Sequence, residues 1–416
     1  MPPGREAAPR DTTLLFTARF IRLFAYGALS VVLVFYLRAI GLSDARIGLL
    51  LTLTLLGDTL VSLAITTHAD RIGRRRMLIA GALLMTGAGI VMAWSTMFWV
   101  LVVAATLGVI SPSGQEVGPF LPIEQAALTG LVDDRARTST YAWYALTGAF
   151  ASALGALGGG FLAQAVQQGP APTVASYRAV VVLYATLGVA LAAVFLALSR
   201  RVEVVTATAA GKTFRLTSGL GSDRSRRVVG GLSALFALDA FGGGFVAQSY
   251  AAYWFHLRFG VDPAVLGSIF FGANLLAGVS ALTASRIAAR FGLVRTMVWT
   301  HLPSNVLLIA VPLMPHLSWA VATLLVRFSI SQMDVPTRQS YVMAVVTPAE
   351  RSAAAGITGV ARTVGAAISP LFVAYCFARP ALVNLPFFLA GTLKIVYDLL
   401  LYRRFVTVKP LQEIDQ

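Results

Sequence analysis

Long runs of hydrophobic residues alternate with short polar segments along the whole chain. A helix needs about 20 mostly apolar residues to cross the hydrocarbon core of a membrane. Twelve stretches meet this requirement, at residues 14–38, 46–68, 76–96, 98–124, 137–165, 176–199, 229–256, 263–288, 294–314, 317–346, 351–377 and 383–403. The pattern therefore predicts an all-α membrane protein with twelve transmembrane helices.

The longest gap between two apolar stretches, at residues 200–228, is polar and rich in arginine. It separates six spans from six, so we expect an N-terminal six-helix bundle at 14–199, a cytoplasmic linker at 200–228 and a C-terminal six-helix bundle at 229–404. Short cytoplasmic tails at 1–13 and 405–416 flank the bundles. Because the first apolar stretch is long and contains Arg19 and Arg22, a cleavable signal peptide is not expected.

Composition and charge agree with a membrane protein. Hydrophobic residues make up 57% of the chain and charged residues 12%, whereas about a quarter of a soluble domain is charged. The net charge of +15 comes from residues in short loops, without a basic domain that would bind nucleic acid. The positive-inside rule places both termini in the cytoplasm. The many arginines and alanines suggest a GC-rich bacterial genome, so we expect the bacterial inner (plasma) membrane.

The two predicted halves share residues at a nearly constant spacing. The matching residues are Gly41 and Gly260, Arg71-Ile72-Gly73 and Arg290-Phe291-Gly292, Pro122 and Pro336, Gln125 and Gln339, and Arg137 and Arg351. Each match alone could be chance, but the shared offset indicates two copies of one six-helix unit. Parallel repeats of this kind are typical of one large class of transporters.

A short basic loop joins the second and third apolar stretches and carries Asp70, Arg71, Gly73 and Arg74. Glycine permits a tight reversal there. The loop, Ala69-Asp70-Arg71-Ile72-Gly73-Arg74-Arg75-Arg76, resembles the one between the second and third helices of the major facilitator superfamily. It departs from the family in having Thr66 where glycine usually opens the motif. With the repeat, the resemblance covers nearly the whole chain.

This resemblance implies a secondary transporter that works by alternating access around a central cavity lined by helices 1, 4, 7 and 10. It also implies that Asp70 docks near the start of the eleventh helix, at residues 348–352, so that Asp70, Arg71, Gly73 and Arg74 form a gating loop. The second copy of the loop has Ala289 in place of Asp70, so the gating acid belongs to the first half. The superfamily is usually monomeric, and we expect a monomer here.

Charged residues inside apolar stretches are candidates for the transport site, because a charge in the membrane is costly unless it is paired or hydrated. They are Arg19, Arg22, Asp58, Glu116, Glu124, Asp239, Arg327, Asp334, Arg338, Arg362, Lys394 and Asp398. At a rise of about 1.5 Å per residue, five of them fall in one layer: Arg22, Glu116, Asp239, Asp334 and Arg362. If the family arrangement holds, these five would meet in one polar chamber.

A carboxylate in a partly desolvated cavity can take up a proton near neutral pH, whereas a nearby arginine opposes this. The candidates for proton coupling are, in order, Asp239, Glu116, Asp58 and Asp334. Asp239 comes first because glycines rather than arginines follow it in the sequence.

The candidates for charge partners or substrate binding are Arg22, Arg362, Arg338, Tyr26 and Gln115. We expect Arg22 to pair with Glu116, and Arg362 to pair with Asp239 or Asp334. Asp334 and Arg338 could also satisfy each other locally, because they lie four residues apart. The alternative is that these residues form fixed ion pairs that only hold helices together.

Two glycine-containing segments refine the picture. Ser111-Pro112-Ser113-Gly114-Gln115-Glu116-Val117-Gly118-Pro119 cannot form a regular helix throughout, and irregular backbone at membrane depth lines a cavity or is buried in protein. Gly155-Ala156-Leu157-Gly158-Gly159-Gly160 resembles a signature of drug/proton antiporters, with Ala156 in place of proline. We expect its small residues to approach the eighth span closely. Those antiporters commonly carry an arginine in the fourth span, and none lies between Val100 and Leu131.

The four histidines, His68, His256, His301 and His316, are expected at membrane edges and are too scattered for a metal site, and no cofactor is expected. The spans lack a catalytic Ser-His-Asp or metal-ligand cluster, which argues against an enzyme. We expect proton-coupled efflux of amphipathic or lipophilic small molecules. The alternative is an importer or facilitator of a polar metabolite, such as a sugar or organic anion.

Overall fold

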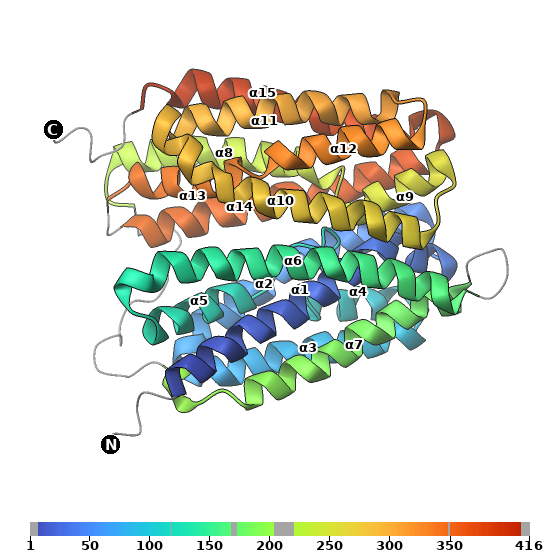
Figure 1. Ribbon diagram of the computed structural model, residues 1–416, viewed down its shortest axis with the longest axis horizontal. Helices are drawn as coiled ribbons and strands as arrows, with labels where there is room; N and C mark the ends of the chain where they lie inside the picture. The colour runs from blue at the N-terminus through green and yellow to red at the C-terminus, as the bar shows by residue number, and fades with distance from the viewer. Residues whose placement is uncertain (1–6, 117, 168–172, 204–219, 348–349, 409–416) are drawn as a thin grey trace. The chain divides into compact units, whose positions relative to one another are not determined.

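The computed structural model describes residues 7–116, 118–167, 173–203, 220–347 and 350–408. These residues form helices and no strand, so the predicted all-α fold is confirmed for the described part of the chain (Figure 1). By their contacts they belong to two compact units. Unit 1 comprises residues 1–212 and 248–274, and unit 2 comprises residues 213–247 and 275–416. Residues 248–274, which the sequence assigns to the C-terminal bundle, group by their contacts with unit 1. The predicted boundaries of the two bundles stay a prediction.

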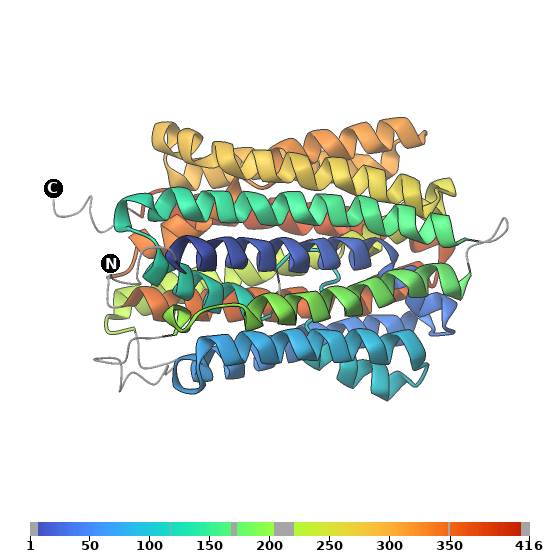
Figure 2. The same ribbon diagram turned by 60° about the horizontal axis from the view of Figure 1, so that its bottom comes forward.

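The described residues of unit 1 form eight α-helices and the beginning of a ninth. They are α1 (Ala7–Ala39), α2 (Asp44–Ile72), α3 (Arg74–Trp94), α4 (Phe98–Leu107), α5 (Phe120–Leu131), α6 (Asp134–Val166), α7 (Val174–Leu196), α9 (Gln248–Phe259) and the first part of α10 (Pro263–Phe291). Figures 1 and 2 show α1 beside α6 and α7, and α3 beside α7. This packing buries α1 almost completely, so charged residues on α1 must find partners inside the unit.

The described residues of unit 2 form the rest of α10 and six further α-helices. These are α8 (Asp223–Gly244), α11 (Leu293–Ala310), α12 (Leu317–Ser331), α13 (Asp334–Ala344), α14 (Arg351–Phe377) and α15 (Leu385–Phe405). Helix α14 packs mainly against α8, and α11 packs against α15. Phe236, Met297, Tyr341, Tyr397 and Phe405 belong to the core between α8, α11, α13 and α15.

Ten helical segments of the described chain are long and apolar enough to cross a membrane. The other two predicted spans are each made of two short helices. The fourth is divided between α4 and α5, and the tenth between α12 and α13. The irregular fourth span was expected from its prolines and glycines, and Gly114 and Gly118 there have φ of 68° and 84°, in the left-handed region that favours glycine.

The break in the tenth span was not expected, because the residues between α12 and α13 are Gln332 and Met333 rather than glycine or proline. A proline does follow closely. Pro336 occupies the third position of α13, as Pro122 occupies the third position of α5. The first turn of a helix leaves its N–H groups unpaired, so proline is tolerated there. These two prolines are a matched pair of the repeat, and both begin the second part of a broken span.

The backbone also repeats at the loops. Gly41 and Gly260 have φ of 92° and 67°, and Gly73 and Gly292 have φ of 112° and 85°. Each pair was matched by its offset in the sequence. The shared positive φ explains why glycine recurs at these positions, since other residues are strained there.

Candidate functional site

Arg22, on α1, is the centre of a buried cluster of charges in unit 1. Its Nη1 and Nη2 lie 2.6 and 2.7 Å from the two carboxylate oxygens of Glu124 on α5. Its Nε donates to Glu116 at 3.0 Å, and the Nη1 of Arg19 donates to the other oxygen of Glu116 at 2.7 Å. The expected pair of Arg22 and Glu116 is therefore present. Two arginines and two carboxylates neutralise one another.

Aromatic side chains enclose this cluster. The hydroxyl of Tyr144 donates to Glu124, and the Tyr144 ring lies 4.5 Å from the guanidinium carbon of Arg19. The ring of Phe120 lies 4.7 Å from the guanidinium carbon of Arg22. Both oxygens of each carboxylate have donors. Protonation of Glu116 or Glu124 would therefore require an ion pair to break.

Asp58, on α2, differs from the other proton-coupling candidates. Its side chain is buried, with 6% of its surface exposed. Its Oδ2 accepts a hydrogen bond of 3.2 Å from the N–H of Gly118, in the irregular segment between α4 and α5, and Ser62 lies one turn further along α2. Among the side chains that the structure describes, no lysine, arginine or histidine forms an ion pair with Asp58. Protonation of Asp58 would therefore break no ion pair among the described residues.

Asp239, on α8, is the centre of a second cluster, in unit 2. The Nζ of Lys394 on α15 lies 2.5 Å from its Oδ1, and the Nη1 of Arg338 on α13 lies 3.0 Å from its Oδ2. The same Nη1 lies 3.1 Å from the Oδ2 of Asp334. Glycines rather than arginines follow Asp239 in the sequence, but two cations that lie 99 and 155 residues away in the chain pair with it.

His301, on α11, extends this cluster. It is buried, with 5% exposed, and its Nδ1 lies 2.9 Å from the Oδ1 of Asp398 on α15. Its Nε2 lies 3.9 Å from the Oδ1 of Asp239. Asn305 donates to the second oxygen of Asp398 at 2.9 Å. The prediction that all four histidines lie at membrane edges is wrong for His301. In the sequence, Asn305 follows His301 by four residues, which places both side chains on one face of a helix. This spacing could have indicated that His301 is part of a polar cluster inside the span.

Arg327 on α12 and Arg362 on α14 are the remaining cations of this region. Arg327 is 8% exposed, and Arg362 is half-buried. Both are near enough to Asp239 and Asp334 to be influenced by their charges. Neither forms an ion pair in the described part of the chain, and the Nε of each is buried without a hydrogen-bond partner. The expected pairing of Arg362 with Asp239 or Asp334 is therefore wrong, because Arg338 and Lys394 take its place.

The other predicted site residues differ in burial. Tyr26 is fully buried, with its ring stacked on Tyr184 at a centroid distance of 6.4 Å, and Gln115 is exposed. The side chains of Asp70 and Arg71 lie outside the described residues. Their roles stay predictions.

Arg74 and Arg75, at the start of α3, bind an acid that the sequence did not single out. The backbone N–H groups of Arg74 and Arg75 donate to the carboxylate of Glu203 at 2.6 and 3.2 Å. The side chain of Arg74 donates to the carbonyl of Ala126 at 3.2 Å. A carboxylate at the start of a helix satisfies free N–H groups there. In the sequence, the only indication that Glu203 binds the start of α3 is its position shortly after the sixth span.

Small residues of α6 allow close helix packing within unit 1. A Cβ on Gly160 would lie 2.3 Å from the carbonyl oxygen of Pro263 and 2.9 Å from the Cα of Gly267, both on α10. A Cβ on Gly155 would lie 2.0 Å from the carbonyl oxygen of Phe24 on α1. The fifth and eighth spans therefore meet at backbone distance, as the glycine pattern indicated.

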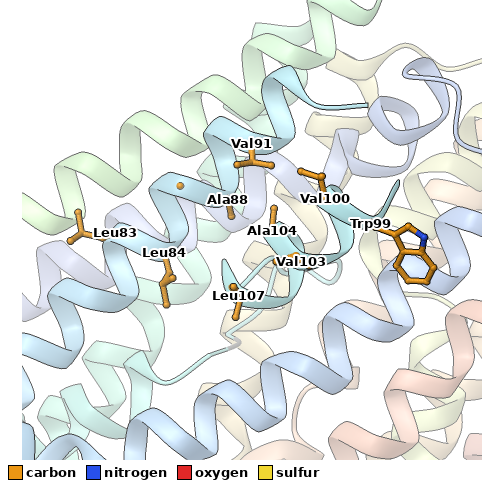
Figure 3. A pocket seen from close by; sticks show the side chains of 10 residues that line it. Leu83, Leu84, Ala88, Val91, Trp99, Val100, Val103, Ala104 and Leu107 are labelled. Atoms are coloured by element: carbon orange, nitrogen blue, oxygen red, sulfur yellow. The ribbon is translucent and has the colours of Figure 1, made fainter. Parts of the chain in front are cut away.

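A cavity of about 530 Å³ in unit 1 lies between α3 and α4. Figure 3 shows Ala88 and Val91 of α3 facing Val100 and Ala104 of α4 across it. Its lining holds no charged residue and none of the predicted site residues. The cavity suits hydrocarbon rather than a charged group.

Comparisons with known proteins agree with this architecture. A family model described as Major Facilitator Superfamily matches residues 15–402. The "Uncharacterized membrane protein YJR124C" of Saccharomyces cerevisiae is 32% identical over 429 residues, which cover 97% of this chain and 96% of that protein.

Solved structures share the fold at low identity. A bacterial homologue of the human lysosomal transporter Spinster, in an inward-facing and occupied conformation, has a TM-score of 0.76 at 15% identity and covers 98% of this chain and 99% of its own. A D-xylose–proton symporter has a TM-score of 0.70 at 14% identity and covers 96% and 98%. The chain is therefore a multi-pass membrane transporter that belongs to the Major Facilitator Superfamily.

Proposed function

We propose that this transporter couples the movement of a small molecule to the movement of protons, with Asp58 as the principal proton carrier. The observation that carries this proposal is a buried carboxylate inside a spanning helix without a cationic partner in the described structure. An ionised carboxylate at membrane depth is costly, so such a group is retained where it has a function. Neutralisation by a proton removes that cost.

The ion-paired candidates rank behind Asp58. Asp239 is held by Lys394 and Arg338, Glu116 by Arg19 and Arg22, and Asp334 by Arg338. Each could take up a proton only in a state in which its ion pair is broken. This changes the order of the proton-coupling candidates that the sequence favoured, since Asp58 moves from third place to first.

For the direction of transport we propose export of amphipathic small molecules, as in the drug/proton antiporter branches. The support is the glycine segment of α6, which resembles their signature and packs at backbone distance against α1 and α10. The competing proposal is uptake of a polar metabolite, since the similar D-xylose–proton symporter is by its name a sugar transporter that takes protons in the same direction. We further propose a monomer in the bacterial inner membrane, with cytoplasmic termini and gating by Asp70, Arg71, Gly73 and Arg74.

The experiment is proton movement in proteoliposomes that contain the purified protein and a pH-sensitive dye. A panel of lipophilic cations, sugars and organic acids is added in turn. Proton flux that depends on one added class, in the direction opposite to that compound, supports the antiporter. Flux in the same direction supports uptake, and compound movement without a proton signal would refute proton coupling.

A further inference from the structure

We propose that the transported molecule carries an anionic group, a carboxylate or a phosphate, and that Arg327 and Arg362 of unit 2 bind it. This inference rests on the proposed transport function and names the class of its substrate. It starts from an imbalance of charge among the side chains in the spans of unit 2.

Among the described helices of unit 2, the cations that are buried or half-buried are Arg327, Arg338, Arg362 and Lys394, and the buried carboxylates are Asp239, Asp334 and Asp398; the other charged side chains of these helices are exposed. One positive charge is in excess when His301 is neutral. The excess lies on the two arginines without an ion pair, because Arg338 and Lys394 already neutralise Asp239 and Asp334. An uncompensated charge in the membrane interior is costly. A bound anion would remove that cost.

The chemistry of the two side chains favours an anion over other ligands. A guanidinium group donates up to five hydrogen bonds in a planar fork, which matches carboxylate and phosphate oxygens. Arg327 is more than nine-tenths buried, and its Nε has no hydrogen-bond partner among the described residues. Its guanidinium carbon lies 4.8 Å from the ring of Phe328, which limits its orientations. The group is therefore held in place with donors unused.

Unit 1 provides the contrast. Its buried arginines in α1, Arg19 and Arg22, both donate to Glu116, and Arg22 also binds Glu124. These cations have carboxylates within the protein and need none from a ligand. The anion site therefore belongs to unit 2.

The test is thermal unfolding of the purified transporter in lipid nanodiscs, with anions and neutral analogues of the same skeleton. The probes are benzoate and benzamide, octanoate and octanamide, and phenyl phosphate and phenol. We expect at least one anion to raise the Tm more than its neutral analogue. We expect Arg327→Gln and Arg362→Gln to abolish this difference, while Arg379→Gln, at an exposed residue just after the end of α14, leaves it unchanged. No anion-specific shift, or a shift that survives both substitutions, would overturn the proposal.

A second readout needs no ligand. Removal of an unpaired buried charge relieves a cost, so Arg327→Gln should raise the Tm of the ligand-free protein. A lower Tm would show that Arg327 is structural and would contradict the proposal. Binding in nanodiscs is measured without a proton gradient, whereas proton coupling is measured as proton flux in proteoliposomes. Loss of the anion-specific shift therefore counts against this inference, and loss of proton flux with the shift intact counts against the proposed coupling alone.

Discussion

At the scale of residues, the two charged clusters differ in how completely their members are paired. Arg22 has acceptors for each of its guanidinium nitrogens, whereas Arg327 and Arg362 have no ion pair in the described structure. A buried ion pair contributes little net stability, but loss of one member leaves the other charge uncompensated. The paired residues therefore mainly hold the helices together, and the arginines without an ion pair are the better candidates for binding a substrate.

Arg22→Met should destabilise the protein by about 3–5 kcal/mol, because Glu116 and Glu124 would lose their shared cation. The free energy of unfolding, from denaturant titrations in mild detergent, measures this. Arg10→Gln is the matched control, since Arg10 is exposed at the start of the same helix. Equal stability of the two variants would contradict the structural role of Arg22.

Some of this pairing could be predicted from the sequence. Arg22 and Glu116 are opposite charges at a similar depth in spans that the family resemblance places together. The pairing of Asp239 with Lys394 could not be predicted, because one sequence does not show how helices far apart in the chain are rotated toward each other. The unpaired state of Asp58 could not be predicted for the same reason.

At the scale of elements, the broken fourth and tenth spans are the clearest product of the repeat. Glu124 is the fifth residue of α5 and binds Arg22 of the first span, and Arg338 is the fifth residue of α13 and binds Asp239 of the seventh. The two ion pairs therefore occupy matching positions of the repeat. The base lies on the first span of the N-terminal half, whereas in the C-terminal half it lies on the broken tenth span. The first break was predictable from prolines and glycines, and the second was not, because Ser331, Gln332 and Met333 carry no such signal.

Gly160→Ala should weaken the packing of α6 against α10, because the new Cβ would lie 2.3 Å from a backbone oxygen. A backbone atom cannot rotate away as a flexible side chain can. We expect a lower Tm and faster hydrogen exchange in α9 and α10. Gly130→Ala, where nothing lies within 4 Å, is the control and should leave both unchanged or raise the Tm slightly. Identical behaviour of the two variants would refute close packing at Gly160.

Glu350 joins the beginning of α14 to the beginning of α8. Its carboxylate accepts from the N–H of Gly221 at 2.7 Å, from the hydroxyl of Ser225 at 2.8 Å and from the hydroxyl of Thr347 at 2.9 Å. Burial opposes ionisation, but these hydrogen bonds together lower the pKa of Glu350 from 4.5 to about 2.

A lowered pKa stabilises the folded state above the unfolded pKa, and this contribution is lost as pH falls toward the folded one. Glu350→Gln should therefore lower the Tm at pH 7, and the difference from the wild type should shrink as pH falls from about 4.5 to about 2. Thermal unfolding in nanodiscs across this range measures it. A difference that is constant with pH would mean that the ionised carboxylate has no stabilising role.

At the scale of the whole molecule, the charge of the proposed anionic substrate means that export and uptake depend differently on the membrane potential. Export of a monoanion with entry of one proton moves two positive charges inward in each cycle. Uptake of the same anion with one proton moves none. Each charge gains about 2.3 kcal/mol per 100 mV of membrane potential. An interior-negative potential should therefore accelerate export by the antiporter and leave a symporter unaffected.

Proteoliposomes with a potassium gradient and valinomycin test this with an anion that passes the binding assay. We expect the rate of anion efflux to rise with the interior-negative potential at constant pH on both sides. Liposomes without protein correct for leakage. An unchanged rate, with proton flux in the same direction as the anion, would contradict export and favour uptake.

The central claim is that Asp58 carries the coupled proton. The most direct measurement compares wild type and Asp58→Asn in two assays on the same proteoliposomes: substrate transport driven by a pH gradient, and exchange of labelled for unlabelled substrate without a gradient. Asp44→Asn, at the start of the same helix, is the control. We predict that Asp58→Asn loses gradient-driven transport and keeps exchange, because the cycle no longer needs a proton. Gradient-driven transport at the wild-type rate in Asp58→Asn would contradict the account.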